Sequence, residues 1–461
     1  MLKASLQDRI ALAMRGGEGP DVSGQPPDAT NVAEAGSRGD ALAPWLLSLV
    51  LLVFWGTLEP FSDRSGSAVL GTQGAGNLLN QLAFPVLAIM AVGFVVVTRP
   101  SHFRGLIAGV YAALVVWLLV IALKSGDIPT ALRRVVFELF CVSIAASALA
   151  LPRSQRELAI IMGSVALFVL GLSYLGVVAF PNLSIHQVTD AVERELAGDW
   201  RGIYTHKNQA GAMMALFIYI GLFVAGAWNK IIGYTVAVAA AVFVWFSHSK
   251  TTIGLVPLVF VVTWMLERTR TSWQRAVVAL GIVVLMNLFT VGASWPGPIR
   301  TIVAKVMTNP TYTGRTDLWR FSAANIAQRP IFGFGMGGFW RTSDIMYKDR
   351  TDVDPENADN WVTELGTDSH NSYLETALQI GIPGLILVIC WVIVLPLLAY
   401  PIAMEPLENR LMARMFTRIW LQVLYMTALE TVFLTRNNPV WFTALVAIFG
   451  LHLLARRRVA H

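Results

Sequence analysis

Residues 201–223, RGIYTHKNQAGAMMALFIYIGLF, join three basic side chains to an apolar run of the length that crosses a lipid bilayer. Arg201, His206 and Lys207 precede this run with no spacer beyond a turn. Charge beside hydrocarbon is costly, so side chains kept at this depth raise the question of what they bind.

Apolar runs of this kind recur along the whole chain. The 461 residues are 55% hydrophobic and only 14% charged, whereas a soluble protein carries about a quarter charged residues. Because a backbone in lipid must satisfy its own hydrogen bonds, the runs predict helices, and we expect an all-α polytopic membrane protein. The sequence predicts twelve spans, at residues 42–58, 81–98, 105–123, 132–150, 158–180, 208–227, 231–247, 251–266, 276–294, 377–399, 412–430 and 439–454.

Composition divides the chain into four parts. Residues 1–41 are rich in Gly, Pro, Asp and Ala and cannot bury enough surface to fold, so we expect a disordered cytoplasmic tail. Residues 42–294 hold nine predicted helices, 295–376 form a large loop, and 377–461 hold three helices and a basic C-terminus. A loop as long as the third part usually carries function.

Lys and Arg are distributed unevenly between the two sides of the predicted bundle. With the N-terminus in the cytoplasm, the cytoplasmic segments hold 18 of these residues and the shorter outer segments hold 9. The positive-inside rule therefore predicts that both termini are cytoplasmic and that the large loop faces outward.

The outer side is nevertheless unusually basic, although positive charge there contributes nothing to this topology. The cations at predicted outer helix ends are Lys124, Arg133, Arg134, Arg201, Lys207, Lys250 and Arg436. Each of them taken alone is explained by a side chain that snorkels to lipid phosphates. As a set at one membrane depth, they favour a binding site for a polyanion.

Histidine is the candidate proton acceptor beside these cations. His370 lies in DSHNSYLE (368–375) just before an apolar helix, with Asn371 following it as a candidate for binding substrate. Imidazole accepts a proton near neutral pH. The alternative for His370, and equally for His206, is a helix-start histidine that bonds to the backbone. No Cys, His or Asp spacing in the chain resembles a zinc site.

Two other segments of the large loop do not predict a cofactor. GFGMGG (333–338) lacks the strand and the acidic residue of a dinucleotide fingerprint, and we expect a tight turn against the membrane surface, after a helix through Leu318, Phe321 and Ile326. The acidic run at 349–359 lacks the glycine and final glutamate of an EF-hand, so we expect a solvated loop.

Together these parts fit the transfer of a glycan from a lipid-linked diphosphate. Arginines would stabilise the charge that develops on the leaving diphosphate, while one base deprotonates the acceptor hydroxyl. A diphosphate leaves without being protonated, so neither a general acid nor a metal is needed. Three aromatic residues are candidates for stacking on sugars: Tyr204, Trp319 and Tyr373.

With these motifs the sequence resembles the O-antigen ligase and polysaccharide polymerase superfamily of bacterial inner membranes. The matching segments, in order, are RGIYTHKNQAG (201–211), SHSKTT (247–252), GRTDLW (314–319), RPIFGFGMGGF (329–339) and DSHNSYLE (368–375). The first and third look most like the exopolysaccharide polymerase branch, of the succinoglycan type.

The resemblance implies a metal-independent, inverting, glycosyltransferase C-like enzyme that acts in the periplasm on undecaprenyl-diphosphate-linked glycans. It implies that His370 is the base and that Arg201 and Arg315 bind the diphosphate, assisted by Lys207, with His206 orienting them or contacting sugar. Relatives often have Ser-Arg-Gly where this chain has Ser249, Lys250 and Thr251, and lysine keeps the charge without the bidentate fork.

Three functions are consistent with the sequence. A polymerase would join repeat units, and a ligase would pass a finished glycan to lipid A core by the same chemistry. A transporter is the least favoured, because it would place ionisable groups near the membrane midplane. No cofactor is expected, and the expected partners are glycan donor and acceptor, membrane lipid and a chain-length regulator or co-polymerase, with no nucleic acid.

Overall fold

A computed structural model describes residues 29–62, 78–103, 109–190, 194–306, 312, 314–340 and 366–457. Within these residues the regular structure is helical, apart from an isolated bridge between Ile185 and Trp200. The longer helices are α2 (Ala29–Trp55), α4 (Leu78–Thr98), α5 (Gly109–Lys124), α6 (Ile128–Ala148), α7 (Gln155–Ala179), α9 (Lys207–Ala227), α10 (Lys230–Phe246), α11 (Lys250–Leu266), α12 (Ser272–Phe289), α13 (Pro298–Val306), α14 (Arg315–Gln328), α17 (Ser372–Ile389), α18 (Leu395–Met404), α19 (Arg410–Met426) and α20 (Pro439–Arg457).

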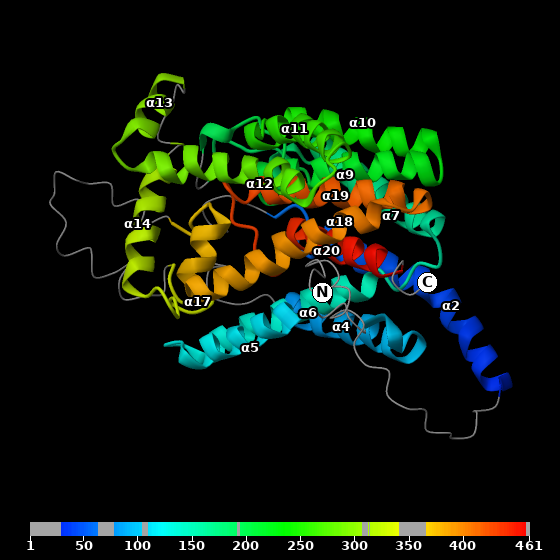
Figure 1. Cartoon of the computed structure of the whole chain (residues 1–461). Coiled ribbons are helices and arrows are strands. Elements are labelled where there is room, and N and C mark those ends of the chain that lie inside the picture. Colours follow the sequence, from blue (N-terminus) through cyan, green and yellow to red (C-terminus); the bar gives the residue numbers. More distant parts are fainter. Residues whose placement is uncertain are drawn as a thin grey trace.

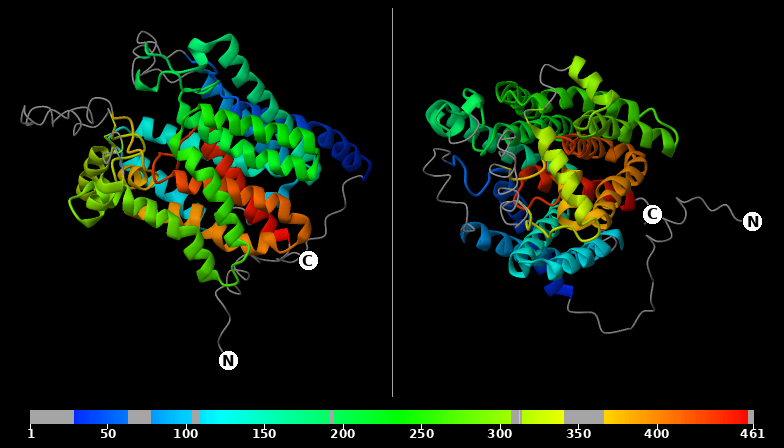
Figure 2. Two further views of the ribbon diagram at one scale, coloured as in Figure 1. Left: turned by 90° about the horizontal axis from the view of Figure 1, so that it is seen from above. Right: turned by 90° about the vertical axis from the view of Figure 1, so that its left-hand side faces the viewer.

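Short elements connect these helices. They are α8 (Pro181–Ser184), the 3₁₀ turns Pro100–Phe103, Arg194–Leu196, Val291–Ser294 and Leu407–Asn409, and the π-helical turn Cys390–Val394. Most long helices run roughly along one direction, whereas α14 lies across one end of the bundle (Figures 1 and 2).

The described helices agree with the predicted membrane class. Six segments are long and apolar enough to cross a membrane: Gln81–Thr98, Gln155–Ala179, Lys207–Ala227, Ser272–Ser294, Ser372–Met404 and Pro439–Arg456. Four more apolar helices are shorter, and they are Ala41–Trp55, Gly109–Lys124, Lys230–Phe246 and Lys250–Leu266. Every predicted span falls on a helix, so the all-α polytopic class is confirmed, while the number of crossings stays a prediction.

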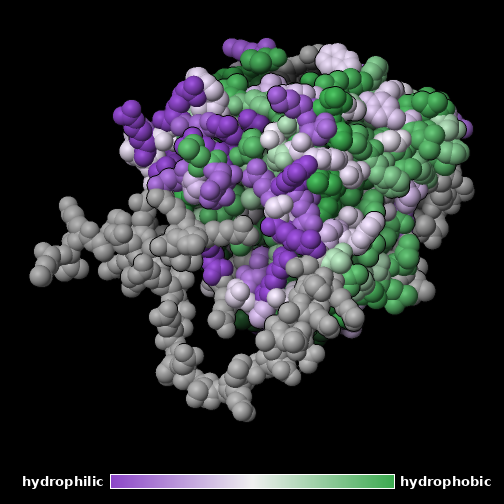
Figure 3. Space-filling model, turned by 90° about the vertical axis from the view of Figure 1, so that its right-hand side faces the viewer, coloured by the Kyte–Doolittle hydropathy of each residue, from purple (hydrophilic) through white to green (hydrophobic). Residues whose placement is uncertain are grey.

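The bundle has a buried centre and an apolar outside. The apolar stretch of α9 is 83% buried, whereas the stretch that begins at Ser272 is only 22% buried. The exposed faces carry large hydrophobic side chains such as Val97, Val178 and Ile231. Figure 3 shows an apolar flank beside the hydrophilic residues at the end opposite α14. An apolar surface of this extent is suited to lipid contact.

Several helix boundaries in the structure differ from the predicted ones. α2 begins at Ala29, so residues 29–41 of the expected disordered tail are helical, in keeping with their many alanines; residues 1–28 lie outside the described residues. α19 ends at Met426, which places Glu430 in a loop instead of the predicted span. The sequence also predicts a short helix near residues 188–196, and the described helical residues there are a 3₁₀ turn at Arg194–Leu196.

The tenth predicted span is longer than expected and is broken. α17 begins at Ser372, is interrupted at Gly381 with φ +74°, and continues through the π-helical turn into α18. Three backbone hydrogen bonds cross the interruption, joining Phe334 to Leu378, Gly335 to Gln379, and Ile382 to Pro330. The glycine-rich segment is therefore a tight turn, as predicted, but it packs into a helix break and satisfies the backbone groups released there.

Candidate active site

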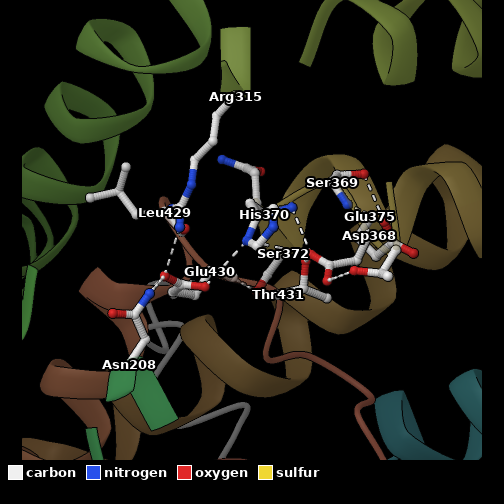
Figure 4. Close-up of polar contacts among 12 residues, drawn as sticks. Asn208, Arg315, Asp368, Ser369, His370, Ser372, Glu375, Leu429, Glu430 and Thr431 are labelled. Atoms are coloured by element: carbon white, nitrogen blue, oxygen red, sulfur yellow. Dashed lines mark hydrogen bonds and ion pairs between the residues drawn. The ribbon is translucent and has the colours of Figure 1, made fainter. Parts of the chain in front are cut away.

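The residues of the candidate site come from four places in the chain that meet at the end of the bundle covered by α14. α14 begins at Arg315, after Gly314 in the left-handed conformation (φ +85°). The guanidinium of Arg315 points away from its helix toward the loop between α19 and α20 (Figure 4). Its Nη2 lies 3.1 Å from Glu430 Oε1, and its Nη1 donates to the carbonyl oxygen of Leu429.

His370 is held in a rare backbone conformation just before α17. Its φ is +45°, a left-handed value that few residues other than glycine adopt, although histidine is among the more tolerant. Its backbone N–H donates to Asp368 Oδ1 at 2.7 Å. Next to it, the Asn371 side chain caps α17 by accepting from the N–H groups of Tyr373 and Leu374, both at 3.0 Å. A strained residue held by its surroundings is a frequent feature of functional sites.

The imidazole of His370 faces two carboxylates. Nδ1 lies 3.4 Å from Glu430 Oε2 and 3.9 Å from Asp368 Oδ1. With the proton of the neutral ring on Nδ1, donated toward Glu430, Nε2 is free to accept a proton. The side chain keeps 34% of its surface exposed, so a substrate can reach it.

Glu430 is the centre of this cluster. Its Oε1 accepts hydrogen bonds from Arg315 and from Asn208 Nδ2 at 2.9 Å, while Oε2 faces His370. The backbone around Glu430 is fixed by Ser372, whose hydroxyl donates to the Glu430 carbonyl at 2.8 Å and accepts from Val432 N–H at 2.8 Å. The start of α9, the start of α14, the start of α17 and the α19–α20 loop are thereby joined.

These contacts set the protonation states of both partners. Burial by itself lowers the pKa of the His370 imidazole, but the charges of Asp368 and Glu430 outweigh burial and Arg315, so the pKa lies above its ordinary value of 6.5. For Glu430, burial alone raises the carboxyl pKa, and Arg315 and His370 reverse the shift and bring the pKa to about 2. Glu430 is therefore ionised, and it stabilises the imidazolium that forms when His370 takes up a proton.

A buried carboxylate, that of Glu375, fixes the loop that carries His370. Glu375 is 3% exposed and accepts from the N–H of Ser369 (2.9 Å), the hydroxyl of Ser369 (2.7 Å), Trp340 Nε1 (2.9 Å) and Gln379 Nε2 (2.5 Å). Trp319 Nε1 donates to the Ser369 carbonyl at 3.0 Å. The position of His370 thus depends on α14, α17 and the 329–340 turn together.

Three side chains predicted to contact substrate lie in the interior instead. Arg201 is completely buried, and its Nη1 donates to the carbonyl oxygens of Ser62 (3.0 Å) and Tyr204 (3.4 Å). Tyr204 is equally buried and donates its hydroxyl to the Trp55 carbonyl at 2.9 Å. Trp319, expected on a sugar, is also completely buried. As described, none of the three side chains is placed to contact a substrate, because the chain folds over them.

The basic residues before α9 form a cluster of their own. Lys207 Nζ lies 2.6 Å from Asp199 Oδ2, and the other carboxylate oxygen lies 2.6 Å from His248 Nδ1. His206 caps α9 by accepting from Asn208 N–H at 3.0 Å, so it takes the helix-start alternative. Lys250 begins α11 and is exposed. Its role in binding substrate stays a prediction.

The remaining predicted residues lie near the α5–α6 connection and at the start of α17. Arg133 and Arg134 lie in α6, and Arg436 lies in the α19–α20 loop with its guanidinium 5.9 Å from the centre of the Phe137 ring. The Asn371 amide donates to Asn287 Oδ1 (2.9 Å) and to the Ala428 carbonyl (3.0 Å), so it fixes the fold of the loop.

The sequence did not assign Glu430, Asp368 or Asn208 to the site. The available signal for Glu430 was an acidic residue at the end of an apolar run, on a side that is otherwise basic. Among the described residues, no group of three or more His, Cys, Asp or Glu is arranged to hold a metal ion. Independence from metal stays a prediction.

Comparison with known proteins identifies the segment that carries His370 and Arg315. Residues 235–389, which start within α10 and end with α17, match the O-antigen ligase family. The chain is 29% identical over 115 residues to a candidate polysaccharide ligase of Rickettsia conorii (strain ATCC VR-613 / Malish 7), covering 25% of this chain and 27% of that protein. It is also 29% identical, over the same shares, to a candidate polysaccharide ligase of Rickettsia felis (strain ATCC VR-1525 / URRWXCal2). The chain thus aligns with about a quarter of these relatives' length, and the predicted resemblance to the O-antigen ligase superfamily is confirmed.

Proposed function

We propose, from the premise that residues 235–389 carry the O-antigen ligase segment, that this chain is a membrane glycosyltransferase acting on lipid-diphosphate-linked glycans. Its reaction joins repeat units carried on undecaprenyl diphosphate into exopolysaccharide or O-antigen. The active site faces the periplasm of a bacterial inner membrane, with both chain termini in the cytoplasm.

The observation that carries this proposal is the contact of one partly exposed imidazole with an ionised carboxylate that also contacts an arginine. His370 Nδ1 faces Glu430 at 3.4 Å, and Arg315 contacts the other oxygen of the same carboxylate at 3.1 Å. A proton acceptor therefore lies close to a cation at the start of a helix. These are the two groups that glycosyl transfer from a diphosphate requires.

The proposed reaction proceeds in one displacement. His370 Nε2 takes the proton of the acceptor hydroxyl while that oxygen attacks the anomeric carbon of the donor. The bond from this carbon to the diphosphate oxygen breaks, and the electron pair leaves with undecaprenyl diphosphate. Attack from the face opposite the leaving group inverts the anomeric configuration. Glu430 and Asp368 stabilise the new imidazolium, and Arg315 stabilises the charge on the diphosphate.

Ligation to lipid A core is the second candidate function. The same base, cation and leaving group would serve it, and only the acceptor differs. The printed names of both Rickettsia relatives favour it, whereas the RGIYTHKN and GRTDLW segments favour the polymerase. We favour polymerisation because the support for it comes from this chain's own sequence, whereas the support for ligation comes from the names of relatives.

The deciding experiment is a reconstitution with defined substrates. The purified chain in proteoliposomes receives a synthetic undecaprenyl-diphosphate repeat unit in the presence of EDTA, and the products are separated by size. A ladder of lengthening glycans supports a metal-independent polymerase. Transfer that occurs only after lipid A core is added replaces it with a ligase. Absence of transfer under both conditions, with folded protein, contradicts the proposed function.

A further inference from the structure

A group of three arginines outside the base cluster forms no ion pair among the described residues. They are Arg133 and Arg134 on α6 and Arg436 in the α19–α20 loop. The ion pairs formed by other arginines of the described residues include Arg315 with Glu430 at 3.1 Å and Arg414 with Glu267 at 2.7 Å. None of the ion pairs among the described residues involves the three arginines.

The acidic residues nearest this group are committed to other partners. Glu138, on the same helix, is buried and accepts from Trp441 Nε1 at 2.7 Å. Glu375 accepts from Ser369, Trp340 and Gln379. Asp127 caps α6 by accepting from Thr130 N–H at 3.1 Å. These carboxylates attract the arginines, but none of them forms an ion pair with the group among the described residues, so the three guanidinium groups keep donors for a further anion.

Arg134 is enclosed by the glycine-rich turn. A Cβ built on Gly337 would lie 1.2 Å from Arg134 Nη1, so the guanidinium occupies the space that a side chain at 337 would fill. Its Nε is buried and has no hydrogen-bond partner among the described residues. An enclosed donor without a partner is unfavourable, and an anionic oxygen that accepted from it would offset this cost.

Crowding of like charges is the second sign of an anion-binding site. Burial, together with the charges of Arg134 and Arg133, lowers the pKa of Arg436 to about 10. Arg133 and Arg436 are exposed, so a ligand can approach from outside. Arginines that converge in this way bind phosphate oxygens through charge-assisted, often bidentate hydrogen bonds.

The arginine group is connected to the base through the glycine-rich turn, but it is distinct from the base. The turn that encloses Arg134 also carries Trp340, which bonds to Glu375, and Glu375 holds Ser369 next to His370. The cation in contact with the base cluster is instead Arg315, whose Nη2 lies against Glu430. One positive group is thus available to the leaving diphosphate, and the other is available to a second anion.

We propose that Arg133, Arg134 and Arg436 bind the diphosphate of the acceptor, a second lipid-linked glycan whose own diphosphate is not cleaved. This inference rests on the proposed function, because a polymerase must hold two lipid-linked substrates at once. The group specifies the charged end of the acceptor and leaves its sugar end free to reach His370.

The test compares two acceptors that differ only at the lipid junction. One carries the repeat unit on undecaprenyl diphosphate, and the other carries the same glycan on an uncharged alkyl anchor. Wild-type protein should favour the first at least tenfold in acceptor kcat/KM. Arg134→Gln combined with Arg436→Gln should abolish that preference, because removing each charge-assisted hydrogen bond weakens binding by about tenfold or more. The matched control is Arg156→Gln with Arg270→Gln, two exposed cations elsewhere on the protein.

A binding measurement separates this inference from the proposed function. Undecaprenyl diphosphate is titrated into nanodiscs that contain the Arg315→Gln variant, with and without the two arginine substitutions. Weaker binding only when Arg134 and Arg436 are replaced supports the site, even if no preparation transfers glycan. Unchanged binding, or equal competition by phosphatidylglycerol, overturns the site, since ordinary lipid headgroups would then explain the arginines.

Discussion

His370 and His248 have the same local conformation in two different surroundings. Their φ values are +45° and +48°, and each lies two residues before a helix, α17 or α11. Each directs Nδ1 toward a carboxylate, Glu430 at 3.4 Å or Asp199 at 2.6 Å. The His248 side chain is 59% exposed, however, against 34% for His370.

The surroundings separate a candidate base from a surface contact. Asp199 is shared with Lys207, a flexible cation, whereas Glu430 is shared with the planar guanidinium of Arg315 and the amide of Asn208. Glu375 also fixes the loop that carries His370, by accepting from the Ser369 N–H. A left-handed histidine next to an acid occurs in both regions, so the fixed partners and the partial enclosure are what distinguish His370 as the candidate base.

The largest expected difference between the two regions is the effect on the transfer rate of removing the imidazole. His370→Ala should lower the rate of transfer by about 10²–10⁴-fold, the usual contribution of a general base. His248→Ala should leave the rate close to that of wild type. Both rates are measured in proteoliposomes with the same donor. Equal losses in the two variants would show that the proposed distinction between the histidines is wrong.

The paired cations provide the next comparison. Arg315→Gln should lower kcat by about 10²-fold, because the variant lacks one positioned donor to the developing charge. Lys207→Gln should have a much smaller effect, because Lys207 pairs with Asp199 and forms no ion pair with Glu430 among the described residues. Steady-state kinetics with varied donor concentration distinguishes the effects on kcat and KM. A large loss of kcat in Lys207→Gln would return Lys207 to the diphosphate site that the sequence predicts.

The pH dependence tests the electrostatics of the His370 cluster. A base acts when deprotonated, so activity should rise with pH through the pKa of His370. Glu430 raises that pKa and Arg315 lowers it, so Glu430→Gln should shift the rising limb to lower pH and Arg315→Gln should shift it to higher pH. The residual activity of each variant is followed across the pH range. Shifts in the same direction would contradict the arrangement of charges described above.

The smallest effect is expected from the acid beside His248. Asp199→Asn removes the carboxylate from two ion pairs, one with the largely buried Lys207 and one with the exposed His248, so it should lower the free energy of unfolding by about 1–2 kcal/mol. The apparent thermal midpoint in detergent measures this change. The pH profile of transfer should coincide with that of wild type, and a shifted limb would connect Asp199 with the base.

Local features of the sequence predicted much of the fold. Apolar run length is a property of consecutive residues, so the helices at 208–227 and 439–454 were placed within a few residues. The break at Gly381 was not predicted, because it depends on a turn some fifty residues earlier that supplies the missing hydrogen bonds. Hydropathy alone carries no information about that partner.

The candidate site was predicted in part for the same reason. His370 and Arg315 stand in recognisable segments, whereas the acid that joins them comes from a loop outside the matched residues 235–389. Arg201 and Tyr204 looked like ligands because charge and aromaticity are visible in the sequence. Their burial results from the fold of segments around Trp55 and Ser62, far away in the chain.

The glycine-rich turn and the first half of α17 form one structural unit. The backbone bonds across Gly381 tie the turn to the helix, and a Cβ at Gly381 would lie 1.9 Å from the Ile331 carbonyl oxygen. A chimera that exchanges the 329–340 turn alone would break the helix it completes. Exchange of residues 314–389 as a single module would keep that joint intact, so the turn and α17 can be transplanted between related proteins only as a block.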